Sequence, residues 1–187
     1  MQPAPTTTVA PFTVLIDTAE TQPFLFDGIH ADAADNYAPL VVPTRFACLG
    51  RYPSSTGDYS ICGYAGRVGV ERKSVDDALA TVLGFADGRR ERFEQELKNL
   101  AAIEAGVVVV EGTLGECVRL APEYGTRTAA ENGRAFFRSI VAFEQDHKTP
   151  IVFCDSRELA QFFTYRFLER YWKREQRRER QLRKGIA

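Results

Sequence analysis

The chain has little of the residue types that mark disulfide-bonded, zinc-binding or membrane proteins. Its 187 residues include two histidines and four cysteines, and no two cysteines have CxxC spacing. This pattern favours neither a disulfide framework nor a zinc site, and it is typical of a reducing compartment. No apolar run approaches the roughly 18 residues that a membrane-spanning helix requires. Residues 1–8 also lack the basic and apolar regions of a signal peptide, so we expect no membrane partner.

The chain has almost no net charge, but its basic side chains are concentrated near the C-terminus. The formal net charge is −1, whereas residues 170–184 carry eight basic and two acidic side chains. Such asymmetry is typical of a segment that meets an acidic polymer. The sequence therefore predicts a basic helical extension over residues 173–187, with a solvated helix end as the alternative. The candidate DNA contacts in this extension are Lys173, Arg174, Arg177 and Arg178.

The length and composition predict one compact domain. A chain of 187 residues can bury a full hydrophobic core, and 44% hydrophobic with 26% charged residues is ordinary for a globular protein. Residues 1–11 are rich in proline and threonine, which predicts a disordered leader. We therefore expect the folded domain to span residues 12–172.

Residues 59–70 contain two short apolar stretches that predict a β-hairpin, with Ala65-Gly66 as its turn. If these two residues are the whole loop, Asp58 lies opposite Lys73. Directly opposed residues share a face of the sheet, and so do alternate residues of one strand. Asp58, Glu71 and Lys73 are then expected on one side, whereas a slip of one residue would separate them.

This group of side chains has the chemistry of a phosphodiesterase site. Two close carboxylates repel each other, so they require a proton or a cation between them. Mg²⁺ prefers carboxylate oxygen and completes its shell with water and substrate phosphate. Lys73 can then orient the attacking water or offset developing negative charge. The alternative is that Glu71-Arg72-Lys73 merely ends an exposed strand, and that Asp77 forms a helix cap with Ser74.

The pattern of these residues resembles the nuclease motif of the XPF-type structure-specific endonucleases, a branch of the PD-(D/E)XK nucleases. Asp58 follows a glycine as in the Gly-Asp element of the motif, Glu71-Arg72-Lys73 matches its central triplet, and Asp77 matches its closing aspartate. The family also has a strand that ends in Asp-x-Arg-Glu. Residues 17–20 match this element except that Ala19 stands where arginine is usual.

The resemblance implies a restriction-endonuclease-like α/β core, in which a central mixed sheet is flanked by helices. It also implies a Mg²⁺- or Mn²⁺-dependent endodeoxyribonuclease that cuts branched or flap DNA in repair, recombination or replication. The implied metal ligands are Asp17, Asp58 and Glu71, with Glu20 and Asp77 in support. Lys73 would position or activate water, and Arg72 would steady the scissile phosphate or the carboxylates. The implied catalytic set is Asp58, Glu71, Arg72, Lys73 and Asp77.

Downstream of this motif, the hydrophobic pattern predicts helices that alternate with strands. Three arginines are expected in the first turn of a helix over residues 89–105, where positive charge opposes the helix macrodipole. We interpret them as phosphate contacts, with a frayed helix start as the alternative: Arg89, Arg90 and Arg92. A buried strand is expected at residues 107–110, a loop at 113–127, a capped helix from Thr128, a strand at 150–154 and a final helix capped by Asp155.

Two further expectations concern assembly and alternative function. XPF-type nuclease domains pair through their later helices, and the aromatic-rich final helix predicts a homodimer by that resemblance. We expect no tandem helix-hairpin-helix module, which leaves the substrate selection of the protein open. The alternative function is a catalytically inactive DNA-binding or scaffold protein with the nuclease fold. We expect a cytoplasmic protein of a prokaryote or a phage-infected host, or a nuclear protein in a eukaryote.

Overall fold

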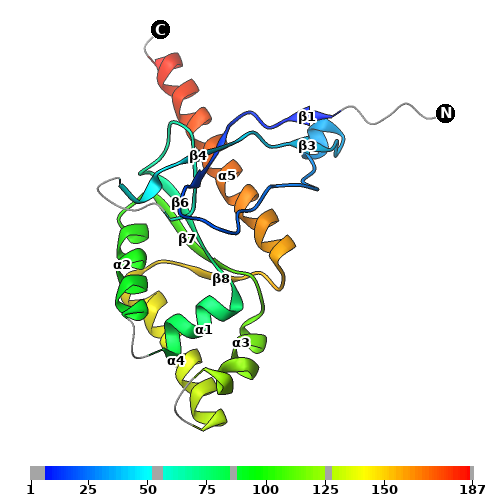
Figure 1. Cartoon of the computed structure of the whole chain (residues 1–187). Coiled ribbons are helices and arrows are strands. Elements are labelled where there is room, and N and C mark those ends of the chain that lie inside the picture. The colour runs from blue at the N-terminus through cyan, green and yellow to red at the C-terminus, as the bar shows by residue number, and fades with distance from the viewer. Residues whose placement is uncertain (1–6, 52–56, 85–87, 125–127, 186–187) are drawn as a thin grey trace, which may run out of the picture.

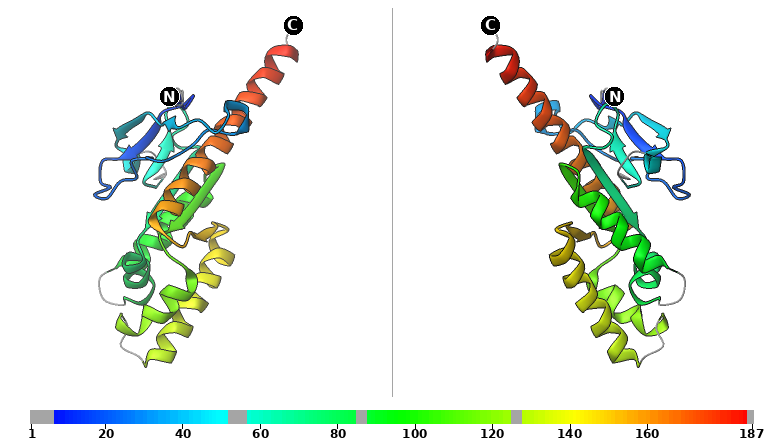
Figure 2. Two further views of the ribbon diagram at one scale, coloured as in Figure 1. Left: turned by 90° about the vertical axis from the view of Figure 1, so that its right-hand side faces the viewer. Right: turned by 90° about the vertical axis from the view of Figure 1, so that its left-hand side faces the viewer.

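The computed structural model describes residues 7–51, 57–84, 88–124 and 128–185 (Figures 1 and 2). The strands are β1 (Thr8–Val9), β2 (Val14–Asp17), β3 (Leu40–Val41), β4 (Thr44–Ala47), β5 (Tyr59–Ile61), β6 (Val68–Lys73), β7 (Ala105–Val110) and β8 (Ile151–Phe153). The α-helices are α1 (Val75–Leu83), α2 (Arg89–Ala101), α3 (Leu114–Leu120), α4 (Ala129–His147) and α5 (Arg157–Gly185). Short 3-10 helices are η1 (Ala33–Asp35), η2 (Leu49–Arg51) and η3 (Ala121–Glu123). No helix in the described part of the chain has the length and apolar character of a membrane span.

Six strands form one mixed sheet in the order β4-β2-β5-β6-β7-β8. The pairs β2–β5 and β5–β6 are antiparallel, and the other neighbouring pairs are parallel. Strands β1 and β3 pair with each other in a separate two-stranded sheet. Helices pack on both faces of the large sheet, which confirms the predicted α/β core with a central mixed sheet.

Alternation along the strands divides the buried side chains between two hydrophobic layers. On β7, Val107 and Val109 pack in the layer that contains α5, whereas Val108 and Val110 pack in the layer that contains α1 to α4. Because successive side chains of a strand point to opposite faces, a run of four buried valines requires a covering layer on each side. Figure 2 shows the C-terminal turns of α5 projecting beyond the rest of the chain.

The hairpin of β5 and β6 has the predicted strands but a longer connection. Residues 62–67 join the strands, and Tyr59 pairs with Val70. The predicted two-residue turn at Ala65-Gly66 is therefore wrong, and the register differs from the predicted one by two residues. Both glycines of the connection have positive φ, which residues with a Cβ rarely adopt. A shift by an even number of residues keeps each side chain on its predicted face of the sheet.

The N-terminal leader is shorter than predicted. Thr8 and Val9 form β1, and Ala10 is buried in the α5 layer. The prediction of disorder is therefore wrong for residues 7–11, whereas residues 1–6 lie outside the described residues. Pairing with β3 satisfies the backbone groups of this segment, which composition alone does not reveal.

Two helix starts also differ from the prediction. Helix α3 occupies much of the loop expected at residues 113–127, and Thr113 caps it by accepting a hydrogen bond from the Glu116 amide (2.9 Å). Helix α5 begins at Arg157, and its cap is Ser156, whose hydroxyl accepts from the Leu159 amide (3.2 Å). Short side chains that accept amide hydrogen bonds favour both starts.

Helix α5 continues without a break through the predicted domain boundary at residue 172. Beyond that point Glu175 is buried and pairs with Arg67 at 2.6 Å, and the Tyr64 hydroxyl donates to Glu179 at 3.1 Å. The first half of the predicted extension at 173–187 is therefore packed against the connection between β5 and β6.

Replacement of Gly106 by alanine is expected to lower the free energy of unfolding by about 1–3 kcal/mol. A Cβ at this position of β7 would lie 2.4 Å from the Leu100 carbonyl oxygen of α2. Gly115→Ala is the matched control, since the nearest atom to its Cβ would be Thr113 Oγ1 at 3.9 Å. In α3 this alanine is expected to raise the unfolding free energy by about 0.5–1 kcal/mol. Urea denaturation measures both effects, and equal effects would contradict close packing of α2 on β7.

Candidate active site

Three acidic residues lie on neighbouring strands at one end of the sheet. Asp17 ends β2, Asp58 directly precedes β5, and Glu71 belongs to β6. The Asp17 amide donates to the Asp58 carbonyl (2.8 Å), and the Asp58 amide donates to the Val70 carbonyl (2.8 Å). The three acidic side chains alternate with residues that pack under α5, so they leave the sheet on the opposite face.

The Asp17 carboxylate is occupied by backbone amides. Its Oδ1 accepts from Ala19 (2.7 Å), and its Oδ2 accepts from Leu49 (2.8 Å) and Gly50 (2.9 Å). The side chain is buried and ties the end of β2 to the η2 turn. A carboxylate that accepts three amide hydrogen bonds is already stabilised as an anion without a metal. Three of the roughly four lone-pair sites of this carboxylate are used by amides, and the metal-ligand role of Asp17 stays a prediction.

Asp58 and Glu71 form a pair of carboxyl groups that repel each other. Burial raises the pKa of Asp58 to about 7, against the hydrogen bond that it accepts from the Arg72 amide (2.7 Å). Burial and the charge of Asp58 raise the pKa of Glu71 well above its usual range, against the attraction of Lys73. Raised pKa values on two neighbouring acids mean that the local positive charge is insufficient for both to ionise readily.

Lys73 lies beside this pair and is held by two carboxylates. Its Nζ donates to Glu71 Oε1 (2.9 Å) and Glu96 Oε2 (3.0 Å), and it lies 5.0 Å from the centre of the Phe93 ring. Burial acts to lower the pKa of Lys73, but the charges of Glu71 and Glu96 outweigh it and raise this pKa. Lys73 is therefore held as a cation next to the acidic pair.

Arg72 leaves β6 on the α5 face, between two residues that point the other way. Its guanidinium binds both oxygens of Glu20 (2.8 and 3.2 Å) and pairs with Glu111 at 3.0 Å. Glu111 also pairs with Arg157, which starts α5. The side chains of Arg72, Glu20 and Glu111 are each at most 10% exposed. Of the two roles predicted for Arg72, these contacts favour steadying carboxylates, and they place Glu20 in an ion pair.

Asp77 lies at the start of α1 and helps to cap it. Its amide donates to Ser74 Oγ (3.1 Å), and its Oδ2 accepts from the same hydroxyl (2.8 Å), which confirms the predicted cap. Asp77 also borders a cavity of about 400 Å³ beside Lys73, here named the lysine cavity. The cavity lining includes Arg89 and Arg92 of α2, so two of the three predicted phosphate contacts lie near the acidic pair.

Arg90 does not join Arg89 and Arg92. Its Nη1 donates to the Val82 carbonyl (3.3 Å) and to Ser139 Oγ (3.4 Å), on the α4 side of α1. Residues 89 and 90 are consecutive in α2, and a helix turns about 100° per residue, so neighbouring side chains diverge. The three predicted arginines therefore do not form one surface.

Most of the predicted basic contacts on α5 are paired with acidic side chains of the chain itself. Arg177 is exposed. Such pairs at a surface contribute little stability and are weakened by salt, so they leave DNA contacts by these residues feasible. The pairs are Lys173 with Asp32 (2.6 Å), Arg174 with Glu104 (3.3 Å) and Arg178 with Glu175 (3.2 Å).

Sequence reasoning assigned no role to Glu96 or Arg157. Glu96 precedes the buried Leu97 on α2. This position beside the apolar face of the helix is the sequence feature that could have predicted its contact with Lys73. Arg157 has no such signal, since its partner Glu111 lies 46 residues away in the sequence.

The acidic pair fits a divalent cation that shares its shell with substrate. Among the described residues, no group of three or more His, Cys, Asp or Glu side chains is placed to hold a metal ion. With the Asp17 oxygens occupied, Asp58 and Glu71 remain, and Mg²⁺ in phosphate-handling sites uses one or two carboxylates together with water and phosphate oxygen. The residues present therefore fit such an ion, although they do not form a closed protein cage.

The fold is an α/β domain whose central mixed sheet carries buried acidic side chains beside a lysine at one end. A family model of the ERCC4 domain matches residues 48–167. The chain belongs to the ERCC4 domain family, a family of DNA endonucleases.

Two solved structures share this fold. XPF from Aeropyrum pernix is 20% identical, with a TM-score of 0.54, and the match covers 91% of this chain and 70% of that chain. XPF from Aeropyrum pernix in complex with DNA is 15% identical, with a TM-score of 0.54, and the match covers 87% of this chain and 66% of that chain. The comparison with curated proteins found no match.

Asp58→Asn is expected to stabilise the metal-free protein at pH 8 by on the order of 2 kcal/mol. The pKa of Asp58 is about 7 in the folded protein and about 3.9 when unfolded. Between these values the folded state binds a proton that the unfolded state lacks, so stability falls as the pH rises. The gain in Asp58→Asn should therefore shrink toward zero at pH 4. Urea denaturation from pH 4 to pH 8 in EDTA measures it, and a gain independent of pH would contradict the assigned shift.

Mg²⁺ or Mn²⁺ is expected to raise the melting temperature of the wild type at pH 8 but not that of Asp58→Asn or Glu71→Gln. A ligand that binds only the folded state stabilises it by mass action, so loss of a ligand side chain removes the effect. Asp146→Asn is the matched control, because Asp146 is exposed on α4, does not line the lysine cavity and should leave the shift unchanged. Equal metal-induced shifts in Asp58→Asn and wild type would show that the ion binds elsewhere.

Proposed function

We propose that this protein is a Mg²⁺- or Mn²⁺-dependent DNA endonuclease that hydrolyses phosphodiester bonds. The observation that carries the proposal is the acidic pair of Asp58 and Glu71, whose pKa values are raised by burial, with Glu71 hydrogen-bonded to the Lys73 ammonium (2.9 Å). Membership of the ERCC4 domain family supports DNA as the substrate.

Asp58 and Glu71 are the residues that would hold the metal. When bound, a divalent ion supplies a Lewis acid that polarises the phosphoryl oxygen and activates water. Glu71 is also a hydrogen-bond partner of Lys73, so it links the metal site to the cation (2.9 Å). Asp58 keeps its orientation through the hydrogen bond from the Arg72 amide (2.7 Å).

Lys73 acts in this proposal as a fixed positive charge. Its raised pKa keeps it protonated at neutral pH, so it donates hydrogen bonds and does not accept the proton of the attacking water. A cation at this position orients water and offsets the negative charge that develops on the phosphoryl group. Glu96 holds the ammonium from the α2 side (3.0 Å) and is a positioning residue.

The lysine cavity is the proposed entry of the DNA strand. Arg89 and Arg92 line it together with Lys73, and the cavity has a volume of about 400 Å³. Guanidinium groups bind phosphate oxygens with paired hydrogen bonds, so they suit the phosphates beside the scissile bond. We further propose, from the resemblance of the motif to XPF-type endonucleases, that the substrate is branched or flap DNA in repair, recombination or replication.

Lys73→Ala is expected to reduce the cleavage rate of a labelled branched duplex in Mn²⁺ by on the order of 10²–10³. Asp58→Ala should reduce it at least as strongly, because half of the acidic pair is lost. Lys98→Ala is the control, because it also removes one lysine charge but from an exposed position on α2. This variant should cleave the duplex at the wild-type rate. Cleavage that persists unchanged in Lys73→Ala and Asp58→Ala would identify a contaminating nuclease. Flap, fork, Holliday-junction and linear duplexes compared in one assay would define the preferred structure.

A catalytically inactive DNA-binding or scaffold protein is the second candidate. The observation that favours it is the occupied Asp17 carboxylate, which leaves two acidic side chains for the ion. Absence of cleavage by the wild type on every DNA structure, with DNA binding retained, would support this candidate over the nuclease.

We also propose a homodimer formed through the groove between β8 and the start of α5. This cavity of about 440 Å³ has a mainly apolar lining that includes Phe153, Leu159 and Phe162. Leu159 is 49% exposed and Phe162 is 44% exposed, and β8 is an edge strand of the sheet. An apolar edge of this kind favours burial against a second copy.

Phe162→Asp is expected to convert the dimer to a monomer in sedimentation analysis at micromolar concentration. The charge would have to be buried at the apolar interface without a partner. Phe137→Asp is the matched control, because Phe137 is 49% exposed but lies on α4. A monomeric wild type would remove the proposal, and dissociation by Phe137→Asp alone would place the interface on α4.

A further inference from the structure

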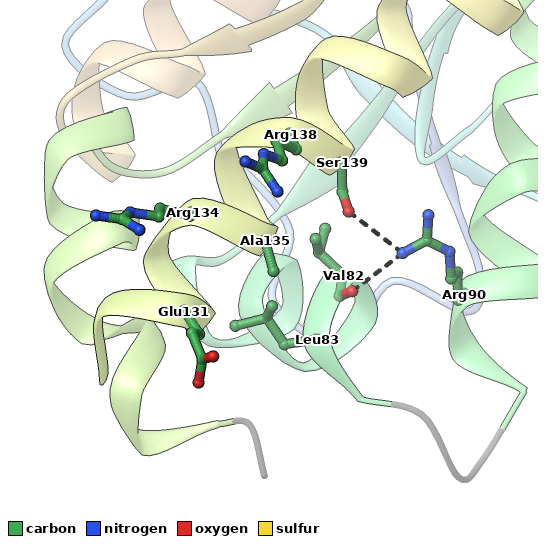
Figure 3. Close-up of a pocket in the computed structure, with 8 residues that line it drawn as sticks. All are labelled: Val82, Leu83, Arg90, Glu131, Arg134, Ala135, Arg138 and Ser139. Carbon is green, nitrogen blue, oxygen red and sulfur yellow. Dashed lines mark hydrogen bonds between the residues drawn. The ribbon is translucent and has the colours of Figure 1, made fainter. Parts of the chain in front are cut away.

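A second basic cavity lies between α1, α2 and α4, here named the arginine cavity (Figure 3). Its volume is about 530 Å³, and three arginines line it: Arg90, Arg134 and Arg138. Val82 and Leu83 of α1 contribute an apolar wall. None of these residues belongs to the acidic pair or to the lysine cavity.

Arg90 is fixed at one side of this cavity. Its Nη1 donates to the Val82 carbonyl (3.3 Å) and Ser139 Oγ (3.4 Å), as Figure 3 shows. Its Nε donates to Glu94 (3.3 Å), and its guanidinium carbon lies 4.8 Å from the centre of the Phe143 ring. A guanidinium held by several contacts loses little further freedom when it meets a ligand.

Arg134 and Arg138 approach from α4, one helical turn apart. Side chains at this spacing have Cβ atoms about 5–6 Å apart, so both can reach one ligand. Both side chains are exposed, and no acidic side chain of the described chain lies within the 4.0 Å of an ion pair with either. The one carboxylate among the described residues of the lining, Glu131, accepts hydrogen bonds from Thr128 at the start of α4 (2.6 and 3.0 Å).

The chemistry of this cavity suits a phosphate group. Among the described residues of the lining, three guanidinium groups stand against the Glu131 carboxylate, and Glu94 pairs with Arg90, so an excess of positive charge remains. Arginine binds phosphate oxygens with two parallel hydrogen bonds, so two arginines one turn apart can hold a single anionic group from one side.

The arginine cavity and the lysine cavity border the same two helices. Arg89 lines the lysine cavity and Arg90 lines the arginine cavity, although they are consecutive residues at the start of α2. In the same way Thr81 borders the lysine cavity and Val82 the arginine cavity on α1. The two cavities therefore border the same two helices, α1 and the start of α2, from different sides.

We propose that Arg134 and Arg138, with Arg90, bind a backbone phosphate of the substrate DNA away from the scissile bond. The identity of the ligand as DNA rests on the proposed function. This second contact positions the duplex relative to the acidic pair without touching the reacting atoms. It carries no base specificity, because it reads the phosphate backbone.

The double variant Arg134→Ala/Arg138→Ala tests the inference through DNA binding. Fluorescence anisotropy with a labelled forked duplex in EDTA should show Kd raised by on the order of tenfold at low salt. The slope of log K against log salt should fall by about 2, since two phosphate contacts are lost. Arg134→Lys/Arg138→Lys should keep the slope, because it keeps both charges.

Lys98→Ala/Arg119→Ala is the matched control. It removes the same two charges at exposed positions that line neither cavity. A wild-type slope in Arg134→Ala/Arg138→Ala, or an equal loss in the control variant, would overturn the inference. A changed sedimentation coefficient with unchanged DNA affinity would also overturn it, because the face would then be a protein interface.

Cleavage kinetics separate this inference from the proposed function. In an active nuclease, Arg134→Ala/Arg138→Ala should raise KM for the forked duplex and leave kcat unchanged, since neither arginine touches the reacting atoms. A fall in kcat with constant KM would contradict a positioning role. If the wild type cleaves nothing, the nuclease proposal fails while the affinity and salt slope still decide whether the arginine cavity binds DNA.

Discussion

The burial of two acidic side chains, Asp58 and Glu71, is the constraint on which the rest of the site depends. Burial raises the pKa of both carboxyl groups, and the charge of Asp58 raises that of Glu71 further, so the folded chain does not readily keep both ionised. The strand pairing of the central sheet and the hydrophobic layers on both faces keep them there. The divalent cation that we propose at this site would offset the cost of keeping both groups ionised.

Strand β6 contributes charged side chains to both faces of the sheet, because successive side chains of a strand point to opposite faces. Glu71 and Lys73 point to the helix layer of α1 and α2, whereas Arg72 points toward α5 and joins Glu20, Glu111 and Arg157. The second set holds the segment after β2 against the start of α5. Ala19 stands where the related motif has arginine, and here the Glu20 carboxylate is bound by Arg72.

The basic cavities and the apolar groove are lined by different elements of the fold. The acidic pair and both basic cavities lie around α1, α2 and α4, whereas the apolar groove lies between β8 and α5. The proposed DNA contacts and the proposed dimer interface therefore involve different elements. The small net charge of −1 does not reveal these basic cavities. The charges that line a cavity, and not the total charge of the chain, determine which ligands it attracts.

Much of the fold followed from local pattern. The four valines of β7, the cap at Ser74 and the motif around Glu71 each depend on residues close in sequence, and these elements are where the sequence placed them. The hairpin shows where local pattern stops being sufficient, because the predicted turn was wrong. The register shifted by two residues, and since side chains alternate with a period of two, Asp58 and Glu71 stayed on one face.

The amino-acid sequence by itself determined the α/β class and the acidic and basic residues of the motif, because periodicity and spacing are local properties. Tertiary structure decided that Asp17 binds the amides of Leu49 and Gly50, and that Glu96 holds Lys73. It also divided Arg89 from Arg90 between two cavities. These contacts join segments that meet only once the sheet is assembled and the helices pack on it. The spacing of residues along the chain therefore does not predict them.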